Sequence, residues 1–214
     1  SSCSGADSIW VGTERFRHVN ILETETLNVF AAGTYVLGDH SIKFGAEYES
    51  RDLFNLFGRD QYGYYEFYGI NAYRAGTPAV YNLFYPTNGC VETRAAAWKL
   101  DNASVFLQDT WTLSPTLNVT AGVRVDMPIV NDKPAYNSLA SNFFGLRNDS
   151  TVDGNYLIQP RVGFNWQPEW SDRKTQVRGG VGLFQGIAAN VWLSNPFSNN
   201  NVTQGAIFEN SALA

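Results

Sequence analysis

Residues 27–49 read LNVFAAGTYVLGDHSIKFGAEYE, in which two alternating runs flank a Gly-Asp pair. Apolar residues or glycine fill the odd positions of the first run, Leu27, Val29, Ala31, Gly33, Tyr35 and Leu37. They fill the even positions of the second run, Ile42, Phe44, Ala46 and Tyr48. A repeat of two residues is that of a β-strand, and Gly-Asp is a two-residue hairpin turn. The pattern predicts an antiparallel hairpin over about 27–49.

The turn at Gly38-Asp39 also fixes the predicted register of this hairpin. It places Leu37 opposite His40 and Gly33 opposite Phe44, so that all the apolar residues share one face. A slip of one residue would scatter them over both faces. An aromatic ring across from a strand glycine is a recurrent pairing, which further supports this register.

Two more hairpins follow the same logic, over about 98–127 and 155–187. In the second hairpin, Ser114-Pro115-Thr116 is predicted to form a three-residue loop that pairs Leu113 with Leu117. Asp109 is the misfit, because it falls on the apolar parity. In the third hairpin the polar segment 168–174 is the predicted turn. Pro160 cannot donate to a ladder, so a bulge is expected there.

The connections fall into two classes. Short turns separate the strands within each hairpin, whereas long loops are expected at about 50–97, 128–154 and 188–214. Short turns on one side and long loops on the other are typical of transmembrane β-barrels of the outer membrane. The predicted fold is an all-β antiparallel meander of about six strands, with residues 1–214 forming part of one barrel domain.

The apolar parity has two interpretations. In a soluble barrel or sandwich it would point into a packed core, and in a membrane barrel it would point outward to lipid. Tyr35, Trp111 and Trp166 lie on this parity, each within a few residues of a short turn. Aromatic residues gathered at one level are typical of an interfacial girdle, which favours the membrane interpretation.

The polar parity carries charges of both signs. In a membrane barrel these residues would face the lumen, where they would pack against a plug or line a path; the alternative is a solvated outer face. The residues concerned are Lys43, Glu47, Glu49, Arg124, Asp126, Arg161 and Arg178.

Composition excludes some classes of function. The 214 residues include 16% charged and 14% aromatic residues, with a net charge of −5 that does not suit a nucleic-acid surface. The mean hydropathy of −0.23 fits a soluble β protein as well as a barrel. No run of about 18 apolar residues predicts a membrane helix, but a membrane strand needs only about 9–11 residues. Catalytic and metal-binding motifs are absent, so we expect neither an enzyme nor a cofactor.

One long loop is rich in aromatic residues. Its rings could stack on a sugar or grip a peptide, since tyrosine adds contact area at low entropic cost. The alternative is an ordinary β-extension whose aromatic residues pack on one another. The residues are Tyr62, Tyr64, Tyr65, Phe67, Tyr68, Tyr73, Tyr81, Phe84 and Tyr85.

The two cysteines, Cys3 and Cys90, both lie outside the alternating segments. A disulfide between them is possible in an oxidising compartment, and two unpaired thiols are the alternative.

The second hairpin resembles that of a known family. Residues 105–111, VFLQDTW, the turn after Leu113 and residues 117–126, LNVTAGVRVD, are similar to a barrel hairpin of TonB-dependent outer-membrane receptors. Residues 159–164, QPRVGF, and 178–184, RGGVGLF, resemble the next hairpin of the Oar-like branch, and residues 38–45 and 55–57 fit that branch too. The resemblance covers roughly residues 27–201.

The resemblance implies a barrel of about 22 strands around a plug, which takes up a scarce ligand with energy delivered through TonB. Six strands cannot close a barrel, so we expect the remaining strands and the plug to come from a larger parent chain. The expected partners are outer-membrane lipid, those missing parts, an unidentified extracellular ligand and, for the parent receptor only, TonB; nucleic acid is not expected. An adhesin or structural surface barrel and a soluble β-sandwich binding module are the alternatives.

Overall fold

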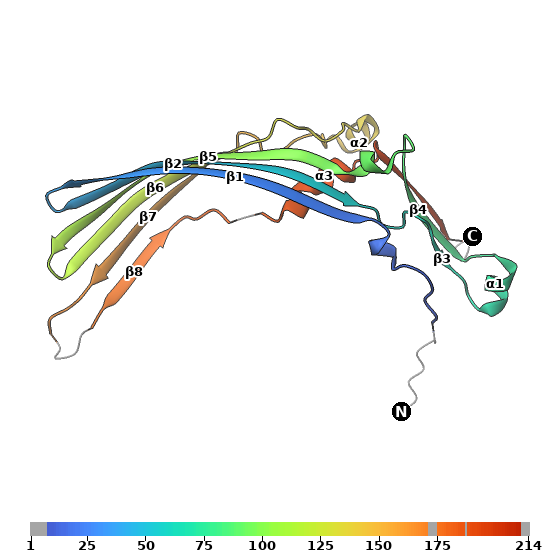
Figure 1. Ribbon diagram of the computed structural model, residues 1–214, viewed down its shortest axis with the longest axis horizontal. Helices are drawn as coiled ribbons and strands as arrows, with labels where there is room; N and C mark the ends of the chain where they lie inside the picture. Colours follow the sequence, from blue (N-terminus) through green and yellow to red (C-terminus); the bar gives the residue numbers. More distant parts are fainter. Residues whose placement is uncertain (1–7, 171–174, 187, 211–214) are drawn as a thin grey trace, which may run out of the picture.

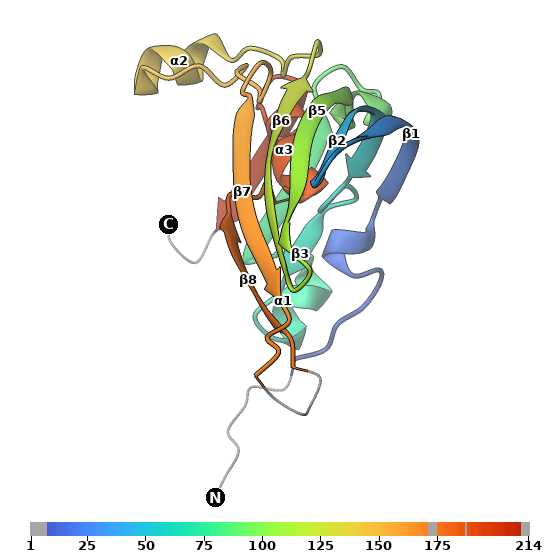
Figure 2. The ribbon, with the colours of Figure 1, turned by 90° about the vertical axis from the view of Figure 1, so that its left-hand side faces the viewer.

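The computed structural model describes residues 8–170, 175–186 and 188–210. Six strands form one antiparallel sheet in the order β1-β2-β5-β6-β7-β8 (Figure 1). Seen from one end in Figure 2, they make a single curved layer. The edges β1 and β8 pair with no further strand among the described residues. The strands are β1 (Asn20–Leu37), β2 (His40–Phe57), β5 (Ala96–Ser114), β6 (Leu117–Ile129), β7 (Leu157–Trp166) and β8 (Val177–Gly182).

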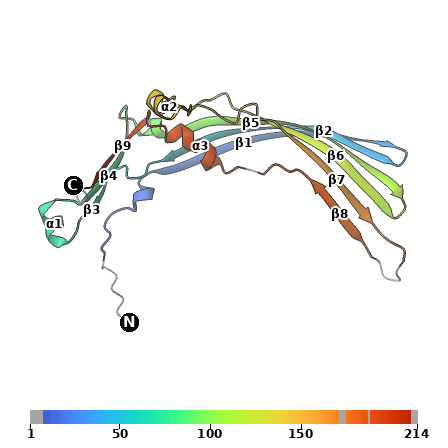
Figure 3. The ribbon, with the colours of Figure 1, turned by 180° about the vertical axis from the view of Figure 1, so that it is seen from behind.

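The long connections carry a second, three-stranded sheet and the helices. This sheet has the order β3-β4-β9, with strands β3 (Tyr64–Glu66), β4 (Val80–Pro86) and β9 (Gln204–Asn210). The helices α1 (Ile70–Ala75), α2 (Ser138–Phe144) and α3 (Asn190–Ser198) gather at the end opposite the short turns, as do the 3₁₀ turns η1 (Arg15–Arg17) and η2 (Val91–Arg94) (Figures 1 and 3). None of the described helices is long and apolar enough to cross a membrane.

The predicted register of the first hairpin is confirmed. Leu37 pairs with His40 and Gly33 with Phe44, and Gly38 takes the positive φ of 58° that this turn requires. The Phe44 ring lies over Gly33, and a Cβ added to that glycine would be 3.0 Å from it. The turn and the alternation were therefore sufficient to align these two strands.

Two local predictions are wrong. The second turn pairs Ser114, not Leu113, with Leu117, because the register shifts between Thr112 and Ser114 and leaves only two residues in the turn. No bulge occurs at Pro160 in the pairing with β6. The N–H of Leu183 donates to the Pro160 carbonyl at 2.9 Å, so this carbonyl faces the β8 side of β7. The proline nitrogen faces the β8 side as well, at a point just beyond the last residue pair of β7 and β8. No ladder donor is needed there. Of the predicted third turn, residues 171–174 lie outside the described part.

The strands are also longer than the alternation predicts. β1 and β2 are 18 residues each and β5 is 19, whereas about 9–11 residues suffice to cross a bilayer. Residues 50–57, expected in a loop, continue β2. The third hairpin is shorter than expected, since β8 ends at Gly182.

Pairing gives the large sheet two distinct faces. The face that carries Val29, Phe44 and Leu107 is called the apolar face, and the opposite one, which carries Glu47 and Arg124, the polar face. Phe44 and Leu107 are 50% and 51% exposed, so no described residue covers the apolar face at mid-strand. A fold that leaves such side chains bare requires an apolar environment on that side.

Candidate functional site

A set of ionised side chains occupies the middle of the polar face. Arg124 of β6 donates from Nη2 to Glu47 of β2 at 2.8 Å and from Nε to Asp126 at 2.9 Å. The Asp126 side chain is only 6% exposed, and those of Glu47 and Arg124 are about a quarter exposed. The guanidinium thus bridges two carboxylates at once, with the forked geometry that favours arginine over lysine.

Neutral polar groups extend this cluster across further strands. Ser104 of β5 and Gln159 of β7 both donate to the Asp126 carboxylate, and Asn28 of β1 donates to Glu47 at 2.8 Å. The Gln159 side-chain oxygen accepts from the backbone N–H of Gln185 at 2.7 Å. We call these six side chains, Asn28, Glu47, Ser104, Arg124, Asp126 and Gln159, the polar network.

The other predicted charges of this face lie outside the polar network. Glu49 pairs with Arg51 at 2.5 Å, closer to the long loops. Lys43 and Arg178 are exposed nearer the short turns. Arg161 lies beside the network, and its Nε has no hydrogen-bond partner within the described part of the chain. The sequence thus placed these residues on one face, and three of the seven are joined directly.

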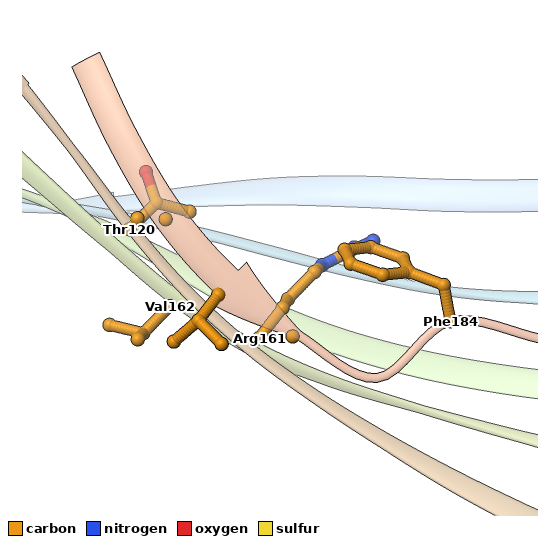
Figure 4. Close-up of a pocket in the computed structure, with 8 residues that line it drawn as sticks. Thr120, Arg161, Val162 and Phe184 are labelled. Atoms are coloured by element: carbon orange, nitrogen blue, oxygen red, sulfur yellow. The ribbon is translucent and has the colours of Figure 1, made fainter.

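Arg161 borders a shallow hollow of about 460 Å³ over β7 and β8. The floor is backbone, because Gly163, Gly180 and Gly182 carry no side chains there. Figure 4 shows Arg161 and Phe184 toward one end of the hollow and Thr120 toward the other. A Cβ on Gly180 would approach a backbone oxygen of β7 to 2.8 Å, so these glycines also allow close strand approach.

The pairing register gives the relative heights of the three rings of the predicted aromatic girdle. The residue pairs that start at Tyr35 on β1 reach Asp109 on β5, two strands away. Trp111 lies two residues further along β5 than Asp109, closer to the short turns. In the same way, the residue pairs that start at Trp111 reach Phe164 on β7, two strands further on. Trp166 lies two residues beyond Phe164, again closer to the short turns. A step of one residue per strand corresponds to a strand tilt of about 35°, since the rise is about 3.4 Å and the spacing about 4.8 Å. Barrel strands tilt by about 35–45°, so the three rings would share one height on a tilted wall.

Asp109 finds a partner on the apolar face. His40, beside the first short turn, approaches it with Nδ1 2.6 Å from Oδ2. Trp111 stacks on the His40 ring, with centroids 5.2 Å apart. The misfit is therefore explained by a polar pair next to an indole, an arrangement typical of a membrane–water interface rather than of the apolar middle.

The nine aromatic residues of the long loop lie on or beside the small sheet. Tyr65 stacks on Tyr81 with centroids 4.8 Å apart, and Phe67 meets Tyr73 edge to face at 5.3 Å. These contacts fit the alternative of a β-extension with self-packing rings. Tyr68, by contrast, is 63% exposed and has no such ring contact among the described residues. The remaining residues of this set are Tyr62, Tyr64, Phe84 and Tyr85.

Two buried charges hold this extension together. Asp60, fully buried with a φ of 49°, accepts from Nη2 of Arg15 at 2.6 Å, and this hydrogen bond raises the arginine pKa. Arg94 is buried among neutral acceptors and donates to Gln204 at 3.1 Å and to Gln61. Burial lowers the pKa of Arg94. No sequence motif pointed to these residues, because their partners are distant in the chain.

No group of His, Cys, Asp or Glu suited to a metal ion occurs in the residues that the structure describes. Cys90 is exposed, and Cys3 lies outside those residues.

Comparisons with known proteins agree with this geometry. The model of a family described as the outer membrane beta barrel domain matches residues 10–212. No curated protein and no solved structure matches the chain. An antiparallel sheet with one bare apolar face, short turns at one end and long loops at the other is what such a barrel requires. The chain therefore belongs to the outer membrane β-barrel domain family, and its place is the outer membrane of Gram-negative bacteria.

Proposed function

We propose that this chain forms part of the wall of a TonB-dependent receptor, of the Oar-like branch, which takes up an extracellular ligand. The apolar face would lie against lipid and the polar face would line the lumen. The polar network is the observation that carries the proposal. It links five neighbouring strands through ionised and amide groups on the inner side of the wall, and such a surface suits contact with a folded plug or with water.

The proposal includes parts beyond the six strands. Among the described strands β1 and β8 are open edges, and an edge strand exposed within a membrane would leave backbone groups unpaired. Further strands are therefore needed to close the barrel, and the plug would fill the lumen. Such a protein binds and passes its ligand, so we expect no catalytic step. The family assignment excludes the alternative of a soluble β-sandwich.

Binding to TonB tests the proposal. The full-length protein, folded in detergent, should bind the purified periplasmic domain of TonB saturably, whereas a plugless outer-membrane barrel of similar size should not. If the folded protein does not retain the TonB domain, the receptor assignment is wrong.

An adhesin is the second candidate, because the aromatic extension presents exposed rings. Tyr62 and Tyr68 are 71% and 63% exposed at the long-loop end. Replacing both by serine should reduce attachment of cells to one another or to a surface if this is the function. TonB binding would be unchanged by that pair, so the two candidates are separable.

A further inference from the structure

Helix α3 lies on the polar face of the sheet, on the concave side seen in Figures 1 and 3. The indole Nε1 of Trp98 donates to Oγ of Ser194 at 2.9 Å, and the Trp98 and Phe197 rings stack 5.2 Å apart and 10° from parallel. Trp98 shares its face with Ser104 of the polar network, because the two lie six residues apart on β5. The helix therefore sits on the inner side of the wall.

The wall beneath α3 differs from the wall below it. A buried apolar cluster lies here, formed by Leu53, Ala96, Trp98 and Val130, each at most 5% exposed. Leu53, Ala96 and Trp98 lie on the parity that is polar around Glu47 and Arg124, and Val130 directly follows the end of β6. Below this level the inner face mixes charged groups with the stacked Phe30 and Phe106 rings, whereas at the level of α3 it carries a buried apolar cluster that the helix covers.

The helix itself has two faces. Asn190, Leu193, Ser194 and Phe197 follow the spacing of one helical face, and Leu193 and Phe197 pack on the buried cluster. On the other side Trp192 is 73% exposed. The apolar side chains toward the wall supply the docking energy, whereas Trp192 points away from it.

Both ends of the segment are tied to other loops or strands. Arg51 of β2 donates to the side chain of Asn190 at 3.3 Å, at the start of α3. Beyond its end, Asn137 donates to the backbone oxygen of Asn200 at 2.9 Å. A helix held at both ends and along one face is a fixed part of the wall.

The height of α3 follows from β2. Leu53 is six residues beyond Glu47 of the polar network, toward the long loops, or about 17 Å higher on a strand tilted by about 35°. Long loops of bacterial outer-membrane barrels are extracellular. The helix thus lies at the extracellular mouth of the barrel.

We propose that α3 is an inward-folded constriction that narrows the extracellular mouth of the barrel, and that Trp192 lines the opening that remains. A helix with its side chains is about 10–12 Å across, so it takes that distance from the lumen. Solutes that enter would be selected by size at this level and would meet an indole surface. The inference requires only the barrel and stands independently of TonB and of ligand uptake.

Labelling of cysteines under the helix tests the docking. In the full-length protein on intact cells, Cys3 and Cys90 are replaced by serine and Leu53→Cys reports access to the wall under α3. A membrane-impermeant maleimide dye should react slowly, and at least about tenfold faster when Leu193→Asp and Phe197→Asp detach the helix. Equal rates would overturn the proposal.

The control variant carries Val191→Asp and Asn195→Asp, the same added charge on the free side of α3; it should label as slowly as the parent, and fast labelling would count against the docking face. Val130→Cys, directly after the end of β6, repeats the measurement at a second position, so the result does not depend on one substitution. The narrowing itself is measured at Asn102→Cys, below the helix. At that position the labelling rate of a polymer-linked maleimide is divided by that of the small dye. This ratio should be at least about tenfold lower when α3 is docked than when it is detached, and equal ratios would refute the constriction.

Discussion

Replacement of Arg124 by leucine tests the energetic role of the polar network. Arg124 makes hydrogen bonds with Glu47 at 2.8 Å, with Ser104 at 2.9 Å and with Asp126 at 2.9 Å. Without the guanidinium, the carboxylates of Glu47 and Asp126, on either side of β5, lose their shared counter-charge. We expect Arg124→Leu to destabilise the barrel.

The magnitude follows from the exposure of the partners. Removing one partner of a fully buried pair costs about 3–5 kcal/mol, and an exposed pair is worth about 0.2–1 kcal/mol. The Asp126 side chain is 6% exposed but that of Glu47 is 27% exposed. The expected loss therefore lies between these limits, at about 2–3 kcal/mol. Arg124→Lys keeps the charge without the fork and should lose about half as much.

The assay is reversible urea unfolding of the full-length protein in lipid vesicles, followed by tryptophan fluorescence. Addition of Asp126→Asn to Arg124→Leu should recover about 1–2 kcal/mol, since it removes the charge left unpaired. If Arg124→Leu unfolds within about 0.5 kcal/mol of the parent, the pairing contributes nothing measurable and the reasoning is wrong.

Three further outcomes are expected in the same assay. Leu107→Arg, on the apolar face at mid-strand, should cost about 2–4 kcal/mol, whereas Gln108→Arg on the adjacent polar-face position should cost little; similar losses would contradict the assigned orientation. Gly45→Ala should cost about 1–3 kcal/mol, because its Cβ would lie 2.6 Å from both a backbone oxygen and an aromatic ring. Gly33→Ala would place a Cβ 3.0 Å from a ring edge alone and should cost less stability. A larger loss for Gly33→Ala than for Gly45→Ala would refute the packing. His40→Ala should cost about 1 kcal/mol, because it leaves the Asp109 carboxylate unpaired on the apolar face. An unchanged midpoint of urea unfolding would show that the His40–Asp109 pair does not stabilise the barrel.

The hairpins could be predicted because local signals agree there. The turn at Gly38-Asp39 and the alternation of 27–49 specify the same register, and the structure has it. The alternation fails where α3 covers the wall, since Leu53 and Trp98 are apolar on the polar parity. Those two residues were the available signal for an inward-folded segment, but alone they look like breaks in the pattern.

The partners of the polar face could not be predicted in the same way. Arg124 and Glu47 were placed on one face by parity, yet their contact spans an intervening strand and depends on side-chain reach. The small sheet is harder still, because β4 pairs with β9 from a distant part of the chain. Pairings of such sequence separation leave no local trace.

The stagger of the aromatic residues and the inward position of α3 together set a lower limit on the circumference of the closed barrel. On strands tilted by about 35°, each strand occupies about 6 Å of circumference, so six provide about 35 Å. A ring of about twelve strands measures about 22 Å between opposite backbones, and wall side chains take about 5 Å on each side. The remaining space, about 12 Å, is the thickness of one helix. A barrel that holds α3 inside and still admits a solute must therefore have more than about twelve strands.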